Sequence, residues 1–228
     1  MQQLSLFSNR YKPKKKVPDD FKAYLVEGAQ FTQTEGYPIL EEWMIPKEIE
    51  DCPFIIPMNQ ISRFDEHTIR NAYISFYCRD RDFKKIMNSP SRYLRLFRKA
   101  KAIIGFDFSI YEDMPLIKQK SQINDNLSLS FYYGIRNIKI IPNIRYGSRQ
   151  TRDGFLEAIP KNSIISIGSY GCVRSKNEKQ AFREFLKEML PAIQPSRIIV
   201  YGAAPNDVFK EYQHCYKFCI CPAMTGLK

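Results

Sequence analysis

The chain has 228 residues and a formal net charge of +11, and it is 44% hydrophobic and 26% charged. These proportions are ordinary for a globular protein and exclude a chain that is disordered throughout. The length suits one well-filled core, and no apolar run approaches the roughly 20 residues that a membrane-spanning helix needs. The excess of Lys and Arg favours a polyanionic partner, and we expect nucleic acid rather than a membrane. The alternative is a surface that basic side chains simply keep soluble.

The first 20 residues are predicted to form a flexible basic arm ahead of a single α/β domain over residues 21–228. The arm has almost no apolar side chain to bury, and Lys14, Lys15 and Lys16 follow one another in it. These lysines are candidate contacts for a phosphate backbone, and the alternative is a frayed terminus. The segment has no apolar stretch of the kind a secretory signal needs. We therefore expect a cytoplasmic protein whose six Cys are reduced thiols.

Short apolar segments recur along the chain and alternate with helical patterns. Strands are predicted at 53–57, 72–78, 102–108, 139–146, 163–171, 197–201 and 215–221. Because helical patterns separate many of these segments, we expect mainly parallel pairing through crossover helices. Two architectures satisfy this pattern, an open doubly wound sheet and a barrel-like (β/α) arrangement. Polar side chains at the ends of several strands favour the second slightly.

Two long helices are predicted from their caps and their apolar periodicity. The first runs from about Met114 to Tyr133, with Asp113 as its cap and Pro115 in its first turn. It carries an apolar stripe and a second stripe that is polar but uncharged, formed by Gln119, Gln122, Asn126 and Ser130. The second follows a pattern that resembles a capping box, Asn177 with Gln180. A third helix is predicted to open at Ser89 and Pro90.

Polar side chains near the carboxyl ends of the predicted strands mark the candidate site. In α/β proteins, ligands bind at that end of the strands. Asp107 and Arg145 lie inside apolar strands and must find partners, because burying either charge alone costs several kcal/mol. We expect Asp107, Arg145 and Asp113 as candidate catalytic residues. The candidate ligand-binding residues are Ser169, Tyr201, Asn143 and Asp80.

The chemistry expected of this site is anion binding, with Arg145 holding a phosphate or carboxylate and Asp107 acting as a base or a metal ligand. The alternative is a structural ion pair between the two. Asp113 is equally explained as a helix cap. Together with Asp80, Asp82 and Glu112 it could also surround a divalent cation, which two-metal phosphoryl transfer requires.

Two further groups suggest weaker possibilities. Gly168-Ser169-Tyr170-Gly171 could turn backbone amides toward an anion, although a tight turn is the simpler interpretation. His214, Cys215, Cys219 and Cys221 are residue types that bind zinc, but Cys219 and Cys221 lack the usual two-residue gap. Alternate thiols on a strand that point into a core explain the pair equally well. The sequence leaves the metal and any other cofactor undetermined.

Several segments together resemble a known family. They are LVEGAQF (25–31), GFDFSIYEDMP (105–115), IIPNIRYG (140–147), IPKNSIISIGSYGC (159–172) and RIIVYGAAPNDVF (197–209). The chain is similar to an uncharacterised domain-of-unknown-function family found in bacterial phages, plasmids and integrated elements, with the signature F-S-x-Y-x-D-M-P. The resemblance spans about residues 25–210. It implies a mobile-element context and supplies neither an activity nor site residues.

The first functional hypothesis is therefore a mobile-element protein that acts on or with nucleic acid, in its stronger form by metal-dependent phosphoryl transfer. The second is a binding module without catalysis that uses the positive charge. The third is a small-molecule enzyme with an anionic ligand at the strand ends. Steep salt dependence of binding distinguishes the first two hypotheses from the third.

Overall fold

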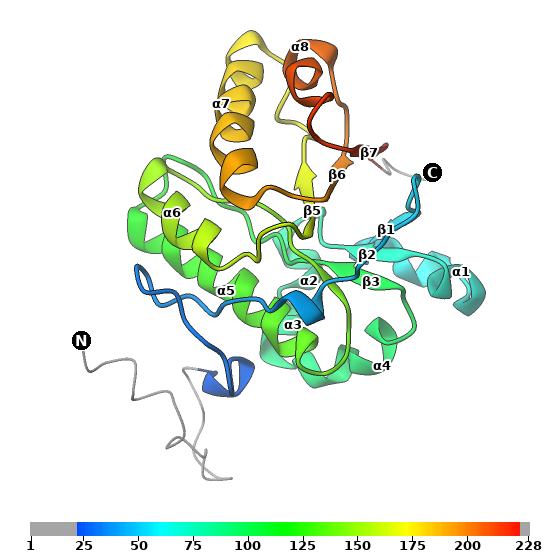
Figure 1. The fold of residues 1–228 in the computed structure, drawn as a ribbon. Coiled ribbons are helices and arrows are strands. Elements are labelled where there is room, and N and C mark those ends of the chain that lie inside the picture. Colours follow the sequence, from blue (N-terminus) through cyan, green and yellow to red (C-terminus); the bar gives the residue numbers. More distant parts are fainter. Residues whose placement is uncertain (1–21, 224–228) are drawn as a thin grey trace.

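The computed structural model describes residues 22–223 and shows parallel strands with helices between them (Figure 1). Every ladder between named strands is parallel, so the predicted α/β class is confirmed. The strands form two sheets, and in each of them neighbours in the chain are neighbours in the sheet. The first sheet contains β1 (Ile55–Pro57), β2 (Tyr73–Ser75), β3 (Ala102–Ile104) and β4 (Ile140–Ile141). The second contains β5 (Ile164–Gly168), β6 (Arg197–Tyr201) and β7 (Phe218–Cys221).

The two sheets meet where the chain leaves β4. Asn143 forms a single parallel bridge with Ser166 of β5. Ile144 N–H donates to the Ser166 carbonyl (2.8 Å), and Ser166 N–H donates to the Pro142 carbonyl (2.8 Å). Pro142 has no N–H to donate, so the ladder cannot continue through this residue toward β4. No ladder joins β7 to β1 within residues 22–223, so the described strands do not form a closed barrel.

The strands are buried on both faces except at β7, where Ile220 is exposed, and alternate residues enter different apolar clusters. Ile103 and Ile198 pack in the large cluster that includes side chains of the long helices. Ile104 and Ile199, one residue further along each strand, pack in a second cluster that lies between side chains of the two sheets. This alternation follows the two-residue period of a strand and explains why the strands read as continuous apolar runs.

The helices lie between the strands in the chain (Figure 1). The α-helices are α1 (Glu66–Arg70), α2 (Asp80–Phe83), α3 (Lys85–Asn88), α4 (Leu94–Phe97), α5 (Leu116–Gly134), α6 (Arg149–Glu157), α7 (Lys176–Ile193) and α8 (Asn206–Phe209). The 3-10 turns are η2 (Ala23–Leu25), η3 (Glu42–Met44), η4 (Met58–Arg63), η5 (Pro90–Tyr93) and η6 (Lys210–Tyr212). None of the helices in residues 22–223 combines the length and apolar character needed to cross a bilayer.

The structure corrects three predicted helix starts. The capping box of α7 is formed by Ser175 and Glu178, two residues before the predicted pair. Helix α5 begins after Pro115 without a side-chain cap, and Asp113 is exposed, so Asp113 does not cap that helix. Ser89 and Pro90 do begin a helical segment, but it is a 3-10 turn followed by the four-residue α4.

The segment before β1 covers the amino ends of strands from both sheets. Ile45 and Ile49 enter the cluster between the sheets. Glu50 accepts hydrogen bonds from Tyr73 of β2 (2.5 Å) and from Lys101, the residue before β3. Asp51 pairs with Arg197 of β6 (2.9 Å) and, in the second sheet too, with Lys217 beside β7 (2.8 Å). Residues 45–51 therefore hold the two sheets together at the end opposite the polar strand termini.

Candidate functional site

A polar network joins the two sheets at the carboxyl ends of their strands. Tyr77, which follows β2, bonds through its hydroxyl to Asn143 Oδ1 (2.9 Å) and to Ser166 Oγ of β5 (2.8 Å). The Asn143 amide in turn donates to Asp107 Oδ1 (2.8 Å). Arg145 Nη1 lies 3.2 Å from Asp107 Oδ2 and 3.3 Å from Asp107 Oδ1. The network thus orders side chains that are far apart in the sequence.

The charges in this network are paired and largely enclosed. The Asp107 side chain is 9% exposed and that of Arg145 is 31% exposed, so the pair reaches solvent through the guanidinium. The Asp107 carboxylate raises the pKa of Arg145 above its ordinary value, and the arginine stays charged. Burial raises the pKa of Tyr77, and the charge of Asp107 raises it further. Tyr77 is therefore a neutral hydrogen-bonding group and not a base.

Aromatic stacking brings a second strand end to the same network. The rings of Tyr77 and Tyr201, the last residue of β6, are stacked with centroids 4.7 Å apart. A Cβ atom at Gly168 would lie 2.9 Å from the Tyr77 ring, so the end of β5 must be this small to accommodate it. Tyr77 therefore contacts or bonds residues from three strand termini. The sequence prediction did not single it out.

The polar stripe of α5 fixes the loop that carries Asp107. Asn126 Oδ1 accepts from Phe108 N–H (2.8 Å), and Gln122 donates to the Ser109 carbonyl (3.4 Å). Gln119 donates to the Met114 carbonyl (2.8 Å), and its Oε1 accepts from Ser148 N–H. Gly105 N–H still donates to the Ile141 carbonyl of β4 (2.8 Å), and beyond it the loop has left the sheet, so its backbone groups need other partners. The stripe provides them, which explains its uncharged character.

A cleft of about 470 Å³ lies at the carboxyl ends of β1 and β2. Its walls come from η4 and from the segment after β2, and the lining residues used below are Asn59, Tyr77, Cys78, Arg79, Arg81 and Asp82. Asn59 Nδ2 donates to Asp82 Oδ2 (3.4 Å). The other carboxylate oxygen, Asp82 Oδ1, lies 3.8 Å from Arg81 Nε. Tyr77 is common to the cleft and to the Asp107 network.

The structure brings together some of the predicted site residues. Asp107, Asn143 and Arg145 are in direct contact, and Tyr201 joins them through Tyr77. Ser169 is buried and donates to the Ala203 carbonyl (2.6 Å). Lys14, Lys15 and Lys16 lie outside the described residues.

Asp80 and the Gly168–Gly171 segment have structural partners. The carboxylate of Asp80 accepts from both the N–H (3.2 Å) and the hydroxyl (2.9 Å) of Ser109, which ties the segment after β2 to the loop after β3. The amides of Ser169 and Tyr170 both point to the Tyr201 carbonyl (3.0 and 3.3 Å). Both amides are therefore bonded to the end of β6 and do not face an anion. The turn itself is closed by Cys172 N–H, which donates to the Ser169 carbonyl (3.0 Å).

The predicted carboxylate cluster is not assembled. Asp107 is held by Asn143 and Arg145, Asp80 by Ser109, and Asp113 is exposed. Within residues 22–223 no group of three or more His, Cys, Asp or Glu side chains is placed to hold a metal ion. Cys219 and Cys221 are buried, whereas Cys215 is exposed. The alternative of alternate thiols pointing into the core therefore describes Cys219 and Cys221.

Comparison with known sequences places this site in a family. The model of a domain of unknown function, DUF4417, matches residues 37–219. The chain belongs to the DUF4417 family. All of the residues in the network and the cleft lie within the matched segment, so both belong to the family domain. The predicted resemblance to an uncharacterised phage-associated family is confirmed.

Two phage proteins are similar in sequence to part of this DUF4417 chain. The Gene 1 protein of Mycobacterium phage L5 is 28% identical over 129 residues, covering 57% of this chain and 56% of its own length. The Gene 1 protein of Mycobacterium phage D29 is 27% identical over 134 residues, covering 59% of this chain and 50% of its own length. The chain thus spans about half the length of the curated relatives it matches. No solved structure matches it significantly.

The residues of the cleft were accessible to sequence reasoning in part. Asn59 and residues 79–82 follow two predicted strands, and Tyr77 and Cys78 end the second of them, which is the position where α/β proteins bind ligands. The missing information was the proximity of η4 to the segment after β2. That proximity depends on parallel pairing between β1 and β2, with Ile55 opposite Tyr73.

Proposed function

We propose that this DUF4417 protein binds nucleic acid through a basic surface, defined here as the exposed Lys and Arg side chains of residues 79–98. The observation that carries the proposal is the charge of this segment. It contains seven Lys or Arg against two Asp, and all seven basic side chains are exposed. They are Arg79, Arg81, Lys84, Lys85, Arg92, Arg95 and Arg98.

These charges are not neutralised by neighbouring carboxylates. Among the described residues, only Arg81 of the seven forms an ion pair, at 3.8 Å from Asp82. A cluster of like charges without partners destabilises the folded state by self-repulsion, and an external polyanion relieves it. Phosphate groups along a strand release counterions when such a surface binds them, which provides affinity without base recognition.

The basic surface is continuous. Its residues lie in or directly beside α2, α3, η5 and α4, and each of these short elements contacts the next. Buried aromatic side chains anchor them to the core, with the ring of Phe83 tilted against Phe76 (5.4 Å between ring centroids) and that of Phe97 edge-on to Tyr133 (4.9 Å). The basic side chains therefore extend from a fixed backbone and not from a loose loop.

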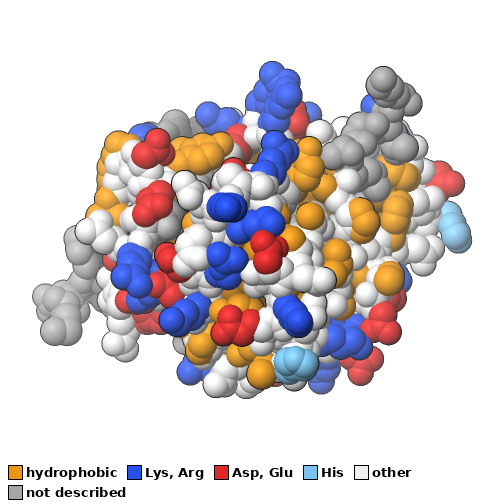
Figure 2. Space-filling model, turned by 90° about the horizontal axis from the view of Figure 1, so that it is seen from above, with side chains coloured by type: hydrophobic (Ala, Val, Ile, Leu, Met, Phe, Trp, Pro, Cys, Tyr) orange, Lys and Arg blue, Asp and Glu red, His pale blue; other side chains and the backbone are white. Residues whose placement is uncertain are grey.

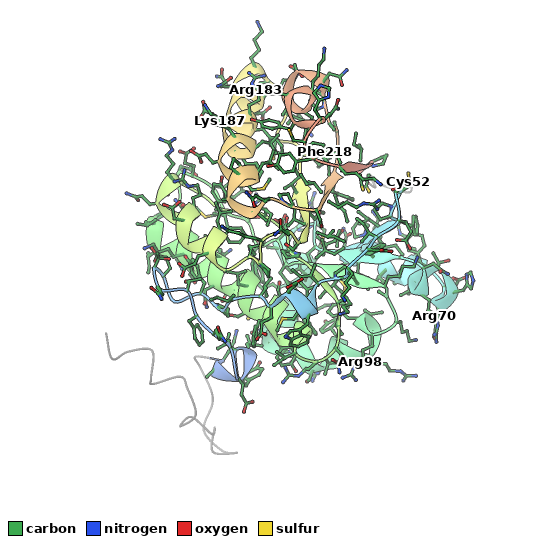
Figure 3. The ribbon with its side chains drawn as sticks, in the orientation of Figure 1. Cys52, Arg70, Arg98, Arg183, Lys187 and Phe218 are labelled. Carbon is green, nitrogen blue, oxygen red and sulfur yellow. The ribbon has the colours of Figure 1, made fainter. Side chains whose placement is uncertain are left out.

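The opposite end of the molecule has a different charge pattern. Figure 2 shows the face formed by α7 and α8, where Lys and Arg side chains have Asp and Glu side chains beside them. Lys179 pairs with Asp207 (2.8 Å), and Arg149 pairs with Glu188 (2.8 Å). In Figure 3, Lys187 of α7 and Arg98 of α4 lie at opposite ends of the molecule. The face over α7 therefore offers a matched control.

The proposal is tested by removing three charges at each end. One variant is Arg92→Ala/Arg95→Ala/Arg98→Ala, and the control is Lys176→Ala/Lys187→Ala/Lys210→Ala, which removes the same charge from exposed positions. Fluorescence anisotropy of labelled duplex and single-stranded oligonucleotides is measured between 50 and 300 mM KCl. The arginine variant is expected to bind at least about tenfold more weakly at 100 mM salt, and its plot of log K against log salt should be shallower by about 2.

The control variant is expected to lose affinity only slightly, because it lowers net charge without removing contacts. Equal losses in the two variants would show that net charge alone attracts the nucleic acid and would contradict the assigned surface. Binding by the wild type that does not respond to salt or to oligonucleotide length would contradict nucleic-acid binding itself.

A further inference from the structure

The cleft at the ends of β1 and β2 is open to solvent and has room for a small molecule. Residues at and after the ends of the two strands line its volume of about 470 Å³. This volume is within the range of about 300–1,000 Å³ that small-molecule sites occupy. It far exceeds the space that one phosphate ion would fill.

The chemistry of the walls favours an anionic ligand with polar edges. Two guanidinium groups, Arg79 and Arg81, face one carboxylate, Asp82, so the cleft carries a net positive charge. Guanidinium groups present planar pairs of donors that match phosphate oxygens. Burial raises the pKa of the Cys78 thiol to about 12, so this side chain adds no negative charge at neutral pH. Nothing in the lining other than Asp82 repels a phosphate.

The remaining lining groups suit a nucleoside. Asn59 donates one amide hydrogen to Asp82 (3.4 Å) and keeps its second hydrogen and its amide oxygen for a ligand, and Asp82 keeps acceptor positions as well. This combination matches the edges of nucleobases and the hydroxyls of ribose. Tyr77 adds an aromatic ring whose hydroxyl is already bonded to Asn143 and Ser166. Because those bonds fix the ring, it lines the cleft without losing conformational freedom when a ligand binds.

We propose that this cleft binds a nucleoside monophosphate, with Arg79 and Arg81 on the phosphate and Asn59 and Asp82 on the nucleoside. The ligand has two sources, a free mononucleotide or the 5′-phosphorylated end of a strand. Only the second source rests on the proposed function. The strand end is suggested by the position of the cleft, because Arg79 and Arg81 belong both to the cleft and to the basic surface. That surface continues from them through α3 and α4.

The first experiment tests the cleft without the rest of the surface. Isothermal titration calorimetry with AMP, dAMP, adenosine and inorganic phosphate is carried out on the wild type, Arg79→Gln, Arg81→Gln and Lys187→Gln. We expect both nucleotides to bind the wild type at least tenfold more tightly than adenosine or phosphate. Arg79→Gln and Arg81→Gln should each weaken nucleotide binding by about tenfold or more. Lys187→Gln removes one exposed positive charge from α7, outside both the cleft and the basic surface, and should leave nucleotide binding unchanged.

The second experiment distinguishes the two sources. Single-stranded oligonucleotides that differ only in a 5′-phosphate or 5′-hydroxyl group are compared for the wild type and Arg81→Gln. Preference for the phosphorylated end that is lost in Arg81→Gln supports the strand end as ligand. Mononucleotide binding without such a preference supports the free nucleotide.

Two outcomes would overturn the proposal. The first is that mononucleotides do not bind and that oligonucleotides show no preference for a 5′-phosphate. If long oligonucleotides still bound, the proposed function would be unaffected. The second is that inorganic phosphate binds as tightly as AMP, which would show that the cleft does not contact the nucleoside. Conversely, mononucleotide binding by a protein that ignores long strands would contradict the proposed function and uphold the cleft. Far-UV circular dichroism of each variant confirms that it is folded.

Discussion

At the scale of single residues, Asp107 shows how a buried charge is accommodated. Its carboxylate receives three donor contacts from two side chains, Asn143 and Arg145, and both donors follow β4 in the chain. An unpaired carboxylate in this place would lose most of its hydration without compensation. The contacts between Asp107 and Arg145 therefore have a structural role, which is the ion-pair alternative given in the sequence analysis. Any catalytic or ligand-binding role for it stays a hypothesis.

Replacing this carboxylate gives a prediction about stability. Asp107→Asn removes the charge that strengthens the bonds from Arg145 and Asn143, and it places an amide donor against the guanidinium. We expect a loss of about 1.5–3 kcal/mol in the free energy of unfolding, the usual range for hydrogen bonds to charged groups. Urea unfolding followed by circular dichroism measures it. Nucleic-acid affinity at 20 °C should remain within about twofold of the wild type, because Asp107 lies outside the basic surface. A stability change below about 0.5 kcal/mol would contradict the structural role of the pair.

At the scale of elements, apolar periodicity predicted where strands would occur but not how long they would be. The predicted strand 102–108 ends at Ile104, and residues 105–108 beyond it stay buried, with Phe106 and Phe108 in the core. Gly105 N–H still donates to the Ile141 carbonyl of β4 (2.8 Å), whereas Phe108 N–H donates to Asn126 of α5. The sequence shows the polar stripe of α5, but only the packing of α5 against this loop reveals what the stripe binds. Helix α6 was missed because it is short and polar.

The segment before β1 gives a second prediction, about pH. Burial alone would raise the pKa of Glu50, but hydrogen bonds from Lys101 and Tyr73 lower it from 4.5 to about 2. A carboxylate with a lowered pKa in the folded state stabilises the protein above pH 4.5, and this contribution is lost as the pH falls toward 2. Glu50→Gln should therefore be less stable than the wild type at pH 7, by about 1 kcal/mol because the side chain is half exposed and screened by solvent.

The difference between Glu50→Gln and the wild type should narrow steadily below pH 5. Urea midpoints at pH 7, 5, 4 and 3.5 measure this narrowing. Glu48→Gln is the matched control, because it removes the same negative charge from an exposed position in the same segment. If the stability difference between Glu50→Gln and the wild type stayed constant from pH 7 to 3.5, the ion pair of Glu50 would not be the cause of that difference.

At the scale of the whole molecule, the sequence indicated the parallel α/β class but not its division into two sheets. Alternating strands and helices require parallel neighbours, and this follows from chain geometry alone. Among the described residues one backbone bridge, Asn143 with Ser166, joins the two sheets, and Pro142 beside it lacks the N–H that a further ladder bond to β5 would need. Apolar periodicity in the sequence cannot show where such a ladder stops.

Two sheets need not mean two folding units, and we expect residues 22–223 to unfold as one. The large apolar cluster contains Ile103 of β3 and Ile198 of β6, so one continuous core connects both sheets. Loss of either sheet would expose apolar surface of the other, which makes a state with one sheet folded unfavourable. Trp43, the only tryptophan, reports on the first sheet because its carbonyl accepts from Lys139, the residue before β4 (2.7 Å).

The prediction is tested by placing the same small cavity in each sheet. Ile103→Val and Ile198→Val should each cost about 1 kcal/mol, and both should shift the Trp43 fluorescence transition in urea with an unchanged slope. Fluorescence and far-UV circular dichroism should give coincident curves for each variant. The result for Ile198→Val is decisive, because this residue lies in the sheet away from Trp43. If that variant left the fluorescence transition in place and moved only part of the circular dichroism signal, the two sheets would be separate cooperative units. Pro142 would then mark the boundary between two domains, because the strand ladder is interrupted there.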